Sequence, residues 1–420
     1  MHGWARLRMQ DLDEDLKRLD NPWPGSIEEL MAIGEEDSPA PDGREGFPTR
    51  RGRQFGNAST CLSKTVATRE HHDHIGIGGR EAFPFEPGRM LSGGAEGARH
   101  GPAMMASGSE GGWERIEPWF EKVAASYNGE SCFARVGQSA SGHFVKMVHN
   151  GIEYAIMQLI AEVYQLLRIG TGRSPKEVAE IFDDWSTGHL NSYLLAISSH
   201  ILSLENTKQE PLVDLIDNKV GAKGTGLWTA QNALELGIAV PSLVAAVQAR
   251  HLTNVCDTTA AQEMTYAAKA TNKVDIDLEE LKDAFTLASL LAYRQGLALI
   301  KGASRTHQWK VDLSKTLQTW RAGCIIRADY LDSVAQGVEY IDTLENESNA
   351  LRKVTGQAVM TGLAFPVLSS TQTYLATLTP PSNGHLVQAQ RDYFGEHGIK
   401  THSGEVCHLT DLVGIDAKVR

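Results

Sequence analysis

The sequence predicts a mainly α-helical protein, in which a large all-helical domain follows a remnant of an α/β domain and a poorly structured N-terminus. Beyond Gly142 apolar residues recur at helical spacing, and alternating strand-type runs are nearly absent. The N-terminal quarter lacks such periodicity and is rich in Pro, Gly and charged residues. We therefore divide the chain into four segments: 1–89, divergent and disordered; 90–141, the α/β remnant; 142–378, all-helical; and 379–420, a C-terminal tail.

Composition excludes several classes of protein. The chain has 420 residues, of which 41% are hydrophobic and 22% charged, as in ordinary globular proteins. It contains no stretch of the roughly 20 apolar residues that a membrane-spanning helix needs. Its formal net charge of −12 argues against nucleic-acid binding. The scattered cysteines form no CxxC pair, which suits a reducing compartment, so we expect a cytoplasmic protein with a plastid location left open.

The first segment holds no recognisable cofactor fingerprint. The nearest match to a dinucleotide-binding turn is Ile75-Gly-Ile-Gly-Gly-Arg80, but Glu81 occupies the third glycine position and no aliphatic strand precedes it. One short helix is expected from Ser26 to Ile33, with Ser26 as its N-cap. The run His71-His-Asp-His74 carries metal-ligating residue types, but its surroundings disfavour a metal site, and we predict no bound metal.

From about Met90 the pattern changes. Glycine-rich Leu91–Arg99 leads into Pro102–Ala106, and a helix is expected over Glu114–Ala125, as at the end of an α/β unit. A series of helices then follows, with visible caps such as Ser174-Pro175. These helices are expected over His143–Arg168, Pro175–Asp184, Asn191–Leu204, Trp228–Leu236, Pro241–Leu252, Leu278–Gly302, Leu317–Val334 and Ser348–Leu363. After about Thr379 the helical pattern breaks down.

The sharpest chemical feature is the run Gly142-His-Phe-Val-Lys-Met-Val-His-Asn-Gly-Ile-Glu-Tyr154. On a helix, its polar residues Lys146, His149, Asn150 and Glu153 share one face, at i, i+3, i+4 and i+7. A lysine and a glutamate two turns apart are separated by about 10 Å along the axis, enough to hold a small substrate between a base and an acid. The alternative is a solvated polar stripe, but the imidazole and amide between the charges favour a site.

A second feature is the loop Gly221-Ala-Lys-Gly-Thr-Gly-Leu-Trp228. Its glycines let backbone N–H groups approach an anion, while Lys223 supplies charge and Thr225 a hydroxyl. A flexible turn between helices explains the same pattern about equally well. Arg250, Arg391 and His397 are single residues of types that usually lie solvated on a surface, and taken alone they indicate little.

From about Met90 to Gly395 the chain resembles decarboxylating 6-phosphogluconate dehydrogenase. The resemblance rests on motifs that occur in the order found in that family. They are Ser92-Gly-Gly-Ala-Glu-Gly-Ala-Arg99, Gly142 to Tyr154, Lys223-Gly-Thr-Gly226 with Trp228-Thr229, Trp320-Arg-Ala-Gly-Cys-Ile-Ile-Arg327 and Gln388-Ala-Gln-Arg-Asp-Tyr-Phe-Gly395. In that light 90–141 is a remnant of a Rossmann-like NADP-binding domain, 142–378 a substrate and dimerisation domain, and 379–420 a tail that reaches the partner subunit.

The resemblance also implies roles for residues. Lys146 matches the family's general base and Glu153 its general acid. Residues that match contacts to the substrate's hydroxyls and carboxylate are Ser92, Gly93, Gly94, His149 and Asn150. Residues that match the phosphate-holding set are Tyr154, Lys223, Thr225, Arg250 and, from the partner subunit's tail, the equivalent of Arg391, with His397 as a further substrate contact. The implied ligands are 6-phosphogluconate and NADP, and the implied assembly is a homodimer with shared active sites.

The missing fingerprint in residues 1–89 leaves the cofactor-binding residues unassigned and two functions open. In the first, the protein oxidatively decarboxylates 6-phosphogluconate to ribulose 5-phosphate and CO2 with reduction of NADP, in the pentose phosphate pathway. In the second, it is a catalytically impaired paralogue that dimerises and binds 6-phosphogluconate without hydride transfer. A related β-hydroxyacid dehydrogenase is disfavoured, because such enzymes share the lysine helix but lack the phosphate set.

Overall fold

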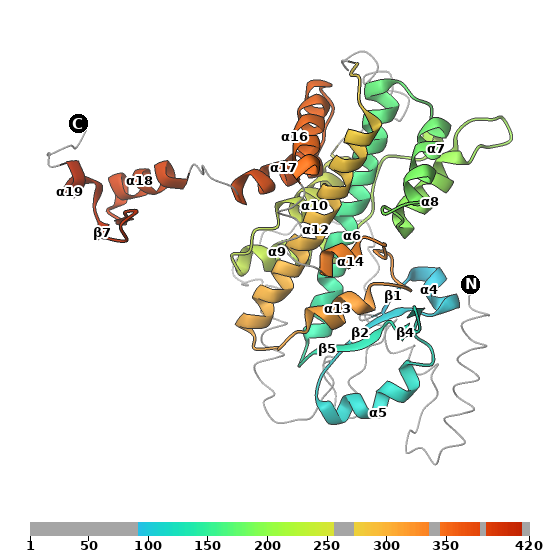
Figure 1. Ribbon diagram of the computed structural model, residues 1–420, viewed down its shortest axis with the longest axis horizontal. Coiled ribbons are helices and arrows are strands. Elements are labelled where there is room, and N and C mark those ends of the chain that lie inside the picture. Colours follow the sequence, from blue (N-terminus) through green and yellow to red (C-terminus); the bar gives the residue numbers. More distant parts are fainter. Residues whose placement is uncertain (1–90, 256–272, 336–344, 379–383, 414–420) are drawn as a thin grey trace, which may run out of the picture. The chain divides into compact units, whose positions relative to one another are not determined.

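The computed structural model describes residues 91–255, 273–335, 345–378 and 384–413 (Figure 1). The chain divides into two compact units, Met1–Thr371 and Gln372–Arg420, and each is described by itself. The expectations for 1–89, including the Ser26–Ile33 helix, the Ile75–Arg80 turn and the His71–His74 run, lie outside the described residues. None of the helices in the described ranges is both long and apolar enough to cross a membrane.

The expected α/β remnant is confirmed as a small three-stranded sheet. Strand β2 (Ala103–Ser107) pairs antiparallel with β1 (Leu91–Ser92) and parallel with β5 (Phe133–Gly137), giving the order β1-β2-β5. The remaining elements are α4 (Gly94–His100), α5 (Glu110–Phe120) and the hairpin β3 (Ser126–Tyr127) with β4 (Glu130–Ser131).

Helix α5 covers the sheet through Trp113, Ile116 and Phe120, which pack against Met104 and Phe133. It begins earlier than expected because the Ser109 side chain caps it, accepting a hydrogen bond from the backbone N–H of Gly112 at 3.3 Å. It also ends earlier, because the chain turns back after Phe120 so that the Ala125 N–H can bond to the Pro102 carbonyl at 3.0 Å.

The confirmed helical domain is built around two long helices that lie side by side (Figure 1). These are α6 (Ser141–Gln165), which continues as the π-helix η2 (Leu166–Thr171), and α12 (Leu278–Thr306). They approach closely at Gly296, where a Cβ atom would lie 2.5 Å from Ile152 Cδ1. Around them lie α7 (Pro175–Ser186), α8 (Tyr193–Ser203), η3 (Leu212–Leu215), α9 (Thr225–Glu235), α10 (Pro241–Thr253), α13 (Leu313–Thr319), α14 (Leu331–Ala335) and α16 (Glu345–Met360), and α17 (Pro366–Leu378) begins in this unit.

The apolar side of α6 agrees with its sequence pattern. Its apolar side chains away from the polar face are buried: Phe144, Val145, Val148, Ile152 and Ile156. Most other helices lie within a few residues of their expected bounds. Helix α9 begins at Thr225, three residues before Trp228, because its N-cap Gly224 has φ 90° and separates the preceding loop from the helix. The rest of the domain is therefore arranged around the helix that carries the sharpest motif.

The expected helix over Leu317–Val334 is wrong. Helix α13 ends at Thr319 and α14 begins only at Leu331, with turns and bends between them. The intervening chain lies against the sheet: the Gly323 carbonyl accepts a hydrogen bond from the Ala103 N–H at 2.8 Å, and Trp320 and Cys324 are fully buried. These residues look helical because they are apolar, but contacts with the sheet determine their conformation.

The second unit contains more helix and strand than the sequence predicted. It contains α18 (Gly384–Gly395), β6 (Ile399–Lys400) paired with β7 (Val406–Cys407), and α19 (Leu409–Val413). The carboxylate of Asp392 is its buried centre, accepting hydrogen bonds from the N–H groups of Gly398 and Leu409 and contacting His408 Nδ1 at 2.9 Å. Since Asp392 is the one buried residue of α18, the helix has no apolar stripe for a sequence pattern to reveal.

Candidate active site

Helix α6 carries the residues predicted to act as base and acid. Lys146, Asn150 and Glu153 are half-buried, and His149 is fully buried. The helix is continuous from Ser141 to Gln165, so Lys146 and Glu153 lie about 10 Å apart along its axis, at ~1.5 Å per residue. Both side chains are thus held on one continuous helix, at a spacing fixed by its geometry.

A chain of hydrogen bonds surrounds Lys146. Its ammonium Nζ donates to Asn150 Oδ1 at 2.8 Å and lies 3.4 Å from His149 Nδ1. The His149 ring lies 3.0 Å from Asn150 Oδ1 through Nδ1 and 3.1 Å from Ser92 Oγ through Nε2. A neutral imidazole protonated on Nδ1 satisfies its contacts with Asn150 and Ser92, because it donates to the amide oxygen and accepts from the serine hydroxyl.

The sheet remnant contributes the segment Ser92-Gly93-Gly94. Ser92 is buried at the end of β1, where it meets His149, whereas Gly94 is exposed. Gly93 has φ 126°, and a Cβ there would lie 2.5 Å from the Gly323 carbonyl oxygen. Only glycine therefore lets this turn pass beneath the Gly323 loop and bring Ser92 to α6.

The glycine loop and α9 bring Thr225 to the same site. Thr225 Oγ1 accepts a hydrogen bond from Asn150 Nδ2 at 3.2 Å, while Lys223 is exposed in the loop before α9. The ring of Tyr154 lies between two elements: the Arg250 guanidinium is 3.3 Å from its centroid, and a Cβ at Gly226 would lie 2.6 Å from its edge. A planar cation stacked on an aromatic ring is held in a fixed orientation, as an anion-binding arginine requires.

Burial shifts the pKa values of the two candidate proton-transfer groups in opposite directions. It lowers the pKa of Lys146, against the opposing influence of Glu153 and Cys324. It raises the pKa of Glu153, against the opposing influence of Lys146 and Arg250. Burial and the nearby Lys146 hold the pKa of His149 well below its usual value. The lysine is thereby shifted toward a neutral base and the glutamate toward a protonated acid.

The structure thus joins Ser92, Lys146, His149, Asn150 and Thr225 by hydrogen bonds, with Tyr154 and Arg250 stacked beside α9. Arg391 and His397 belong to the second unit, and both are exposed. Within their own unit, Arg391 donates to Gln388 Oε1 at 3.0 Å and His397 packs edge-on against Phe394.

Trp320 and Thr229 belong to motifs that carry the family resemblance, but the sequence predicted no role for either residue. The Trp320 ring lies edge-on to His149, with 5.9 Å between centroids, and the Thr229 hydroxyl lies 2.9 Å from the Met147 carbonyl of α6. Both contacts join positions far apart in the chain, so no local spacing could have revealed them.

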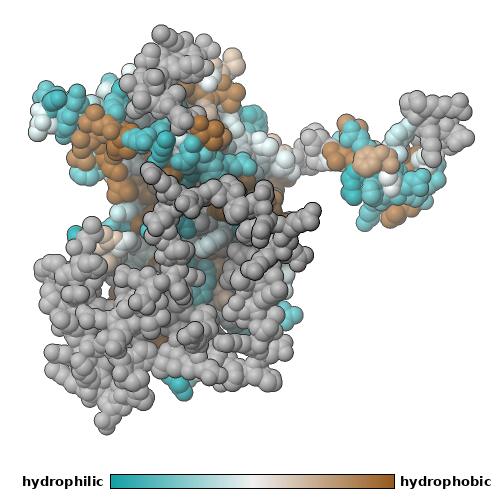
Figure 2. All heavy atoms as spheres, turned by 180° about the vertical axis from the view of Figure 1, so that it is seen from behind, coloured by the Kyte–Doolittle hydropathy of each residue, from teal (hydrophilic) through white to brown (hydrophobic). Residues whose placement is uncertain are grey.

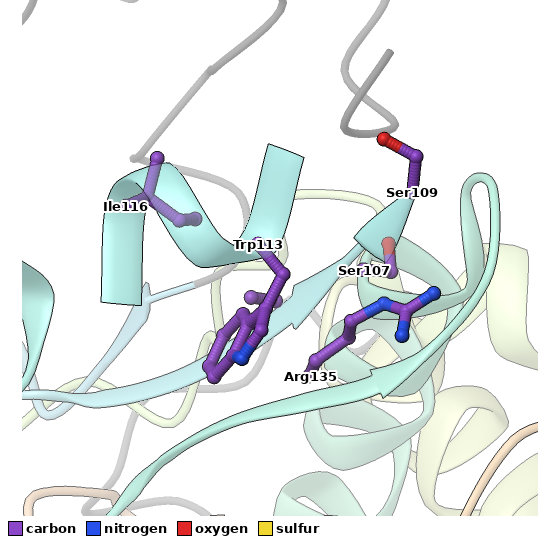
Figure 3. Close-up of a pocket in the computed structure, with 6 residues that line it drawn as sticks. Ser107, Ser109, Trp113, Ile116 and Arg135 are labelled. Carbon is purple, nitrogen blue, oxygen red and sulfur yellow. The ribbon is translucent and has the colours of Figure 1, made fainter. Parts of the chain in front are cut away.

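A separate shallow hollow lies between α5 and the sheet, and it has no room for a ligand (Figure 3). Its polar lining is Ser107, Ser109 and Arg135. The Arg135 guanidinium already donates to the Gly108 carbonyl and pairs with Glu110 in the first turn of α5. A carboxylate at that helix start repels phosphate, so this turn does not fit a dinucleotide. Among the described residues we find no phosphate-holding turn for a cofactor.

Comparison with known proteins agrees with this geometry. Residues 142–411 match the family model of the 6-phosphogluconate dehydrogenase C-terminal domain, and residues 89–137 match the NAD binding domain of 6-phosphogluconate dehydrogenase. A solved structure of Plasmodium falciparum 6-phosphogluconate dehydrogenase superposes with a TM-score of 0.68 at 34% identity, covering 76% of this chain and 73% of that one.

Curated relatives lead to the same family. The decarboxylating 6-phosphogluconate dehydrogenase of Cunninghamella elegans is 39% identical over 331 residues, which cover 74% of this chain and 68% of the relative. The NAD(+)-dependent, decarboxylating enzyme of Bacillus subtilis is 37% identical, covering 73% of this chain and 70% of the relative. The resemblance indicated by the motifs is confirmed: the chain belongs to the 6-phosphogluconate dehydrogenase family.

Proposed function

We propose that the chain catalyses the oxidative decarboxylation of 6-phosphogluconate to ribulose 5-phosphate and CO2, a reaction of the pentose phosphate pathway. The observation that carries this proposal is the pair Lys146 and Glu153. The two groups project from one helix, and burial lowers the pKa of the lysine and raises that of the glutamate. The relatives from Cunninghamella elegans and Bacillus subtilis are both described as decarboxylating.

Lys146 is the proposed base for the oxidation. In its neutral form it accepts the proton of the C3 hydroxyl. A bound nicotinamide cofactor would supply the acceptor for the hydride of C3. The contact of Lys146 Nζ with Asn150 Oδ1 orients the amine, and the buried, neutral His149 adds no positive charge beside it. The product of this step is a β-keto acid with a protonated lysine at its carbonyl.

The same two residues then serve the loss of CO2. The C1 carboxylate leaves, its bonding electrons pass to C2, and the protonated Lys146 stabilises the developing enolate oxygen on C3. Glu153, whose raised pKa favours its protonated form, donates a proton to substrate C2, the carbon that becomes C1 of ribulose 5-phosphate. These proton transfers yield ribulose 5-phosphate, and solvent restores the starting protonation of Lys146 and Glu153.

We propose that the substrate phosphate lies near the stack of Tyr154 and Arg250, with Lys223 and Thr225 completing its contacts. Ser92, Gly93 and Gly94, together with His149 and Asn150, would then meet the sugar hydroxyls and carboxylate. Arg391 and His397 would come from the tail of a partner subunit. This division agrees with the positive charge gathered on α10 and the α9 loop.

A homodimer is the assembly that we propose. On α9 and α10, large apolar side chains are exposed, including Leu234 at 74% and Leu252 at 61%. Apolar patches also lie among hydrophilic ones on the described surface in Figure 2. Exposed apolar side chains on adjacent helices are typical of a subunit interface.

The cytoplasm is the location that we propose, because the free thiols Cys132, Cys324 and Cys407 suit a reducing compartment.

NADP is the cofactor that we propose. The solved Plasmodium falciparum structure is described in complex with its cofactor NADP+, whereas the Bacillus subtilis relative is described as NAD(+)-dependent. We assign none of the described residues to cofactor binding.

The test is direct: the purified chain is mixed with 6-phosphogluconate and either NADP or NAD, and reduced cofactor is followed by absorbance together with released CO2. Both products should form in equal amounts. Binding of 6-phosphogluconate by calorimetry without either product would instead support the catalytically impaired paralogue.

A further inference from the structure

Helices α6 and α9 are joined at a point that the proposed mechanism does not use. The hydroxyl of Thr229, a residue only 1% exposed, lies 2.9 Å from the Met147 carbonyl of α6 and 2.9 Å from the Thr225 carbonyl of its own helix. Its single proton is shared between these two acceptors. A buried threonine on a helix usually bonds only to its own preceding turn, so the bond to a neighbouring helix is the unusual feature.

Gly151 of α6 makes this contact sterically possible. A Cβ at Gly151 would lie 2.6 Å from Thr229 Cγ2 and 3.0 Å from Thr229 Oγ1. Such distances are shorter than van der Waals contact, so any side chain at this position would push the helices apart. Gly151 and Thr229 therefore set the separation of α6 and α9.

The distance between α6 and α9 determines where the first turn of α9 lies relative to the candidate site. Thr225, one turn before Thr229, receives the hydrogen bond from Asn150 Nδ2 at 3.2 Å, and Lys223 directly precedes that turn. The Thr225 carbonyl and the Thr229 hydroxyl are themselves bonded. A movement of Thr229 away from α6 would consequently carry Thr225 away from Asn150.

We propose that Thr229, seated on Gly151, is a positioning residue that holds the Thr225 and Lys223 end of α9 against α6 in register for binding the phosphorylated substrate. The inference rests on the proposed function. Thr229 acts through Thr225 and does not touch the substrate. Lys146 is oriented by Asn150 of its own helix, so the effect should fall on substrate binding more than on the chemical step.

The first test compares T229V, which removes the hydroxyl, with T229S, which keeps it. T229V should weaken 6-phosphogluconate binding about five- to tenfold, the size expected for one lost hydrogen bond, and raise KM similarly with kcat within twofold. T229S should bind like the unmodified chain. The matched control is T316V, because Thr316 is also fully buried and bonds to a carbonyl of its preceding turn, at 2.8 Å, on α13.

Calorimetric Kd, steady-state kinetics and Tm are measured for each variant. A merely structural role predicts that T229V and T316V both lower Tm while neither changes Kd, and that result would overturn the inference. If the unmodified chain itself fails to bind 6-phosphogluconate, the proposed function falls and this inference with it. Normal binding by the unmodified chain and by T229V overturns the inference alone.

A second test uses the contact with Gly151. G151A should weaken substrate binding, because its methyl group would displace Thr229. The double variant G151A/T229S removes the Cγ2 atom that this methyl group would meet, so it should recover part of the lost affinity. Binding that is no better in the double variant than in G151A would contradict a shared contact between these two positions.

Discussion

Ser92 Oγ lies 3.1 Å from His149 Nε2, and this contact joins the sheet remnant to the helix that carries the proposed base. Both residues are buried, so neither can exchange its partner for water. The serine hydroxyl donates to Nε2, which leaves the Nδ1 proton for Asn150 Oδ1, the oxygen that also receives Lys146 Nζ. The position of β1 therefore influences the orientation of the proposed base through two intervening side chains.

The turn after Ser92 should tolerate no side chain. We expect G93A to lower the free energy of unfolding by about 2–4 kcal/mol, because alanine is strained at φ 126° and its Cβ would clash with the Gly323 carbonyl oxygen. Urea unfolding followed by circular dichroism measures the change. G129A is the control, since Gly129 also has positive φ, +84°, but its Cβ would meet open space. Equal losses in the two variants would show that backbone strain alone, without the Gly323 contact, explains the effect.

The proposed base is tested by K146A. Turnover should become undetectable, because the variant lacks the amine proposed to take the C3 proton, while binding of 6-phosphogluconate should stay measurable. Single-turnover assays and calorimetry separate the two effects. K301A, which removes an exposed lysine of α12, serves as the control and should keep normal turnover. Near-normal turnover by K146A would contradict the assignment.

Helical spacing was sufficient to predict which residues of α6 are buried and which polar residues share one face. Lys146 and Glu153 lie on one continuous helix, and the apolar positions between them are buried, because a buried amphipathic helix follows its 3.6-residue period. The glycine-rich Ser92 segment and His149 were both recognisable as parts of motifs, but the contact between Ser92 and His149 was not. That contact depends on the packing of a sheet against a helix, which no local pattern encodes.

Patterns were insufficient where tertiary contacts override local preference. The stretch from Trp320 to Tyr330 is apolar enough to suggest a helix, yet its backbone bonds to β2 through the Gly323 carbonyl and to Tyr193 through the Arg327 carbonyl. Conversely, α18 forms around a single buried carboxylate, Asp392, and shows no apolar stripe. The roles of Arg391 and His397 remain predictions that rest on the family resemblance.

Arg250 provides a test of phosphate recognition. R250K keeps the positive charge but loses the planar stack on Tyr154, so affinity for 6-phosphogluconate should fall about tenfold. The weaker affinity for unphosphorylated gluconate should not change, since that ligand lacks the group Arg250 is proposed to hold. Calorimetry with both ligands measures the difference, and R305K, at an exposed arginine of α12, is the control. An equal loss for both ligands would argue against a phosphate role.

Glu162 should make stability depend on pH. It is buried on α6 and accepts hydrogen bonds from the N–H groups of Val367 and Leu368 at 2.9 and 2.8 Å, at the start of α17. These donors favour the carboxylate, but burial outweighs them and raises the pKa from 4.5 to about 7. Because the folded pKa is above the unfolded one, the folded state holds the proton more tightly.

Ionisation of Glu162 therefore lowers the free energy of unfolding. This loss of stability is absent below pH 4.5, grows as the pH rises, and reaches its full size above about pH 7. A shift of this size corresponds to about 3 kcal/mol. In E162Q the side chain cannot ionise, so its free energy of unfolding relative to the unmodified chain should rise by up to about that amount between pH 5 and pH 8. Urea unfolding at several pH values measures this, with E114Q, at an exposed glutamate of α5, as control. A relative stability of E162Q that is flat with pH, or that falls as pH rises, would mean that the two backbone donors outweigh burial at this carboxylate.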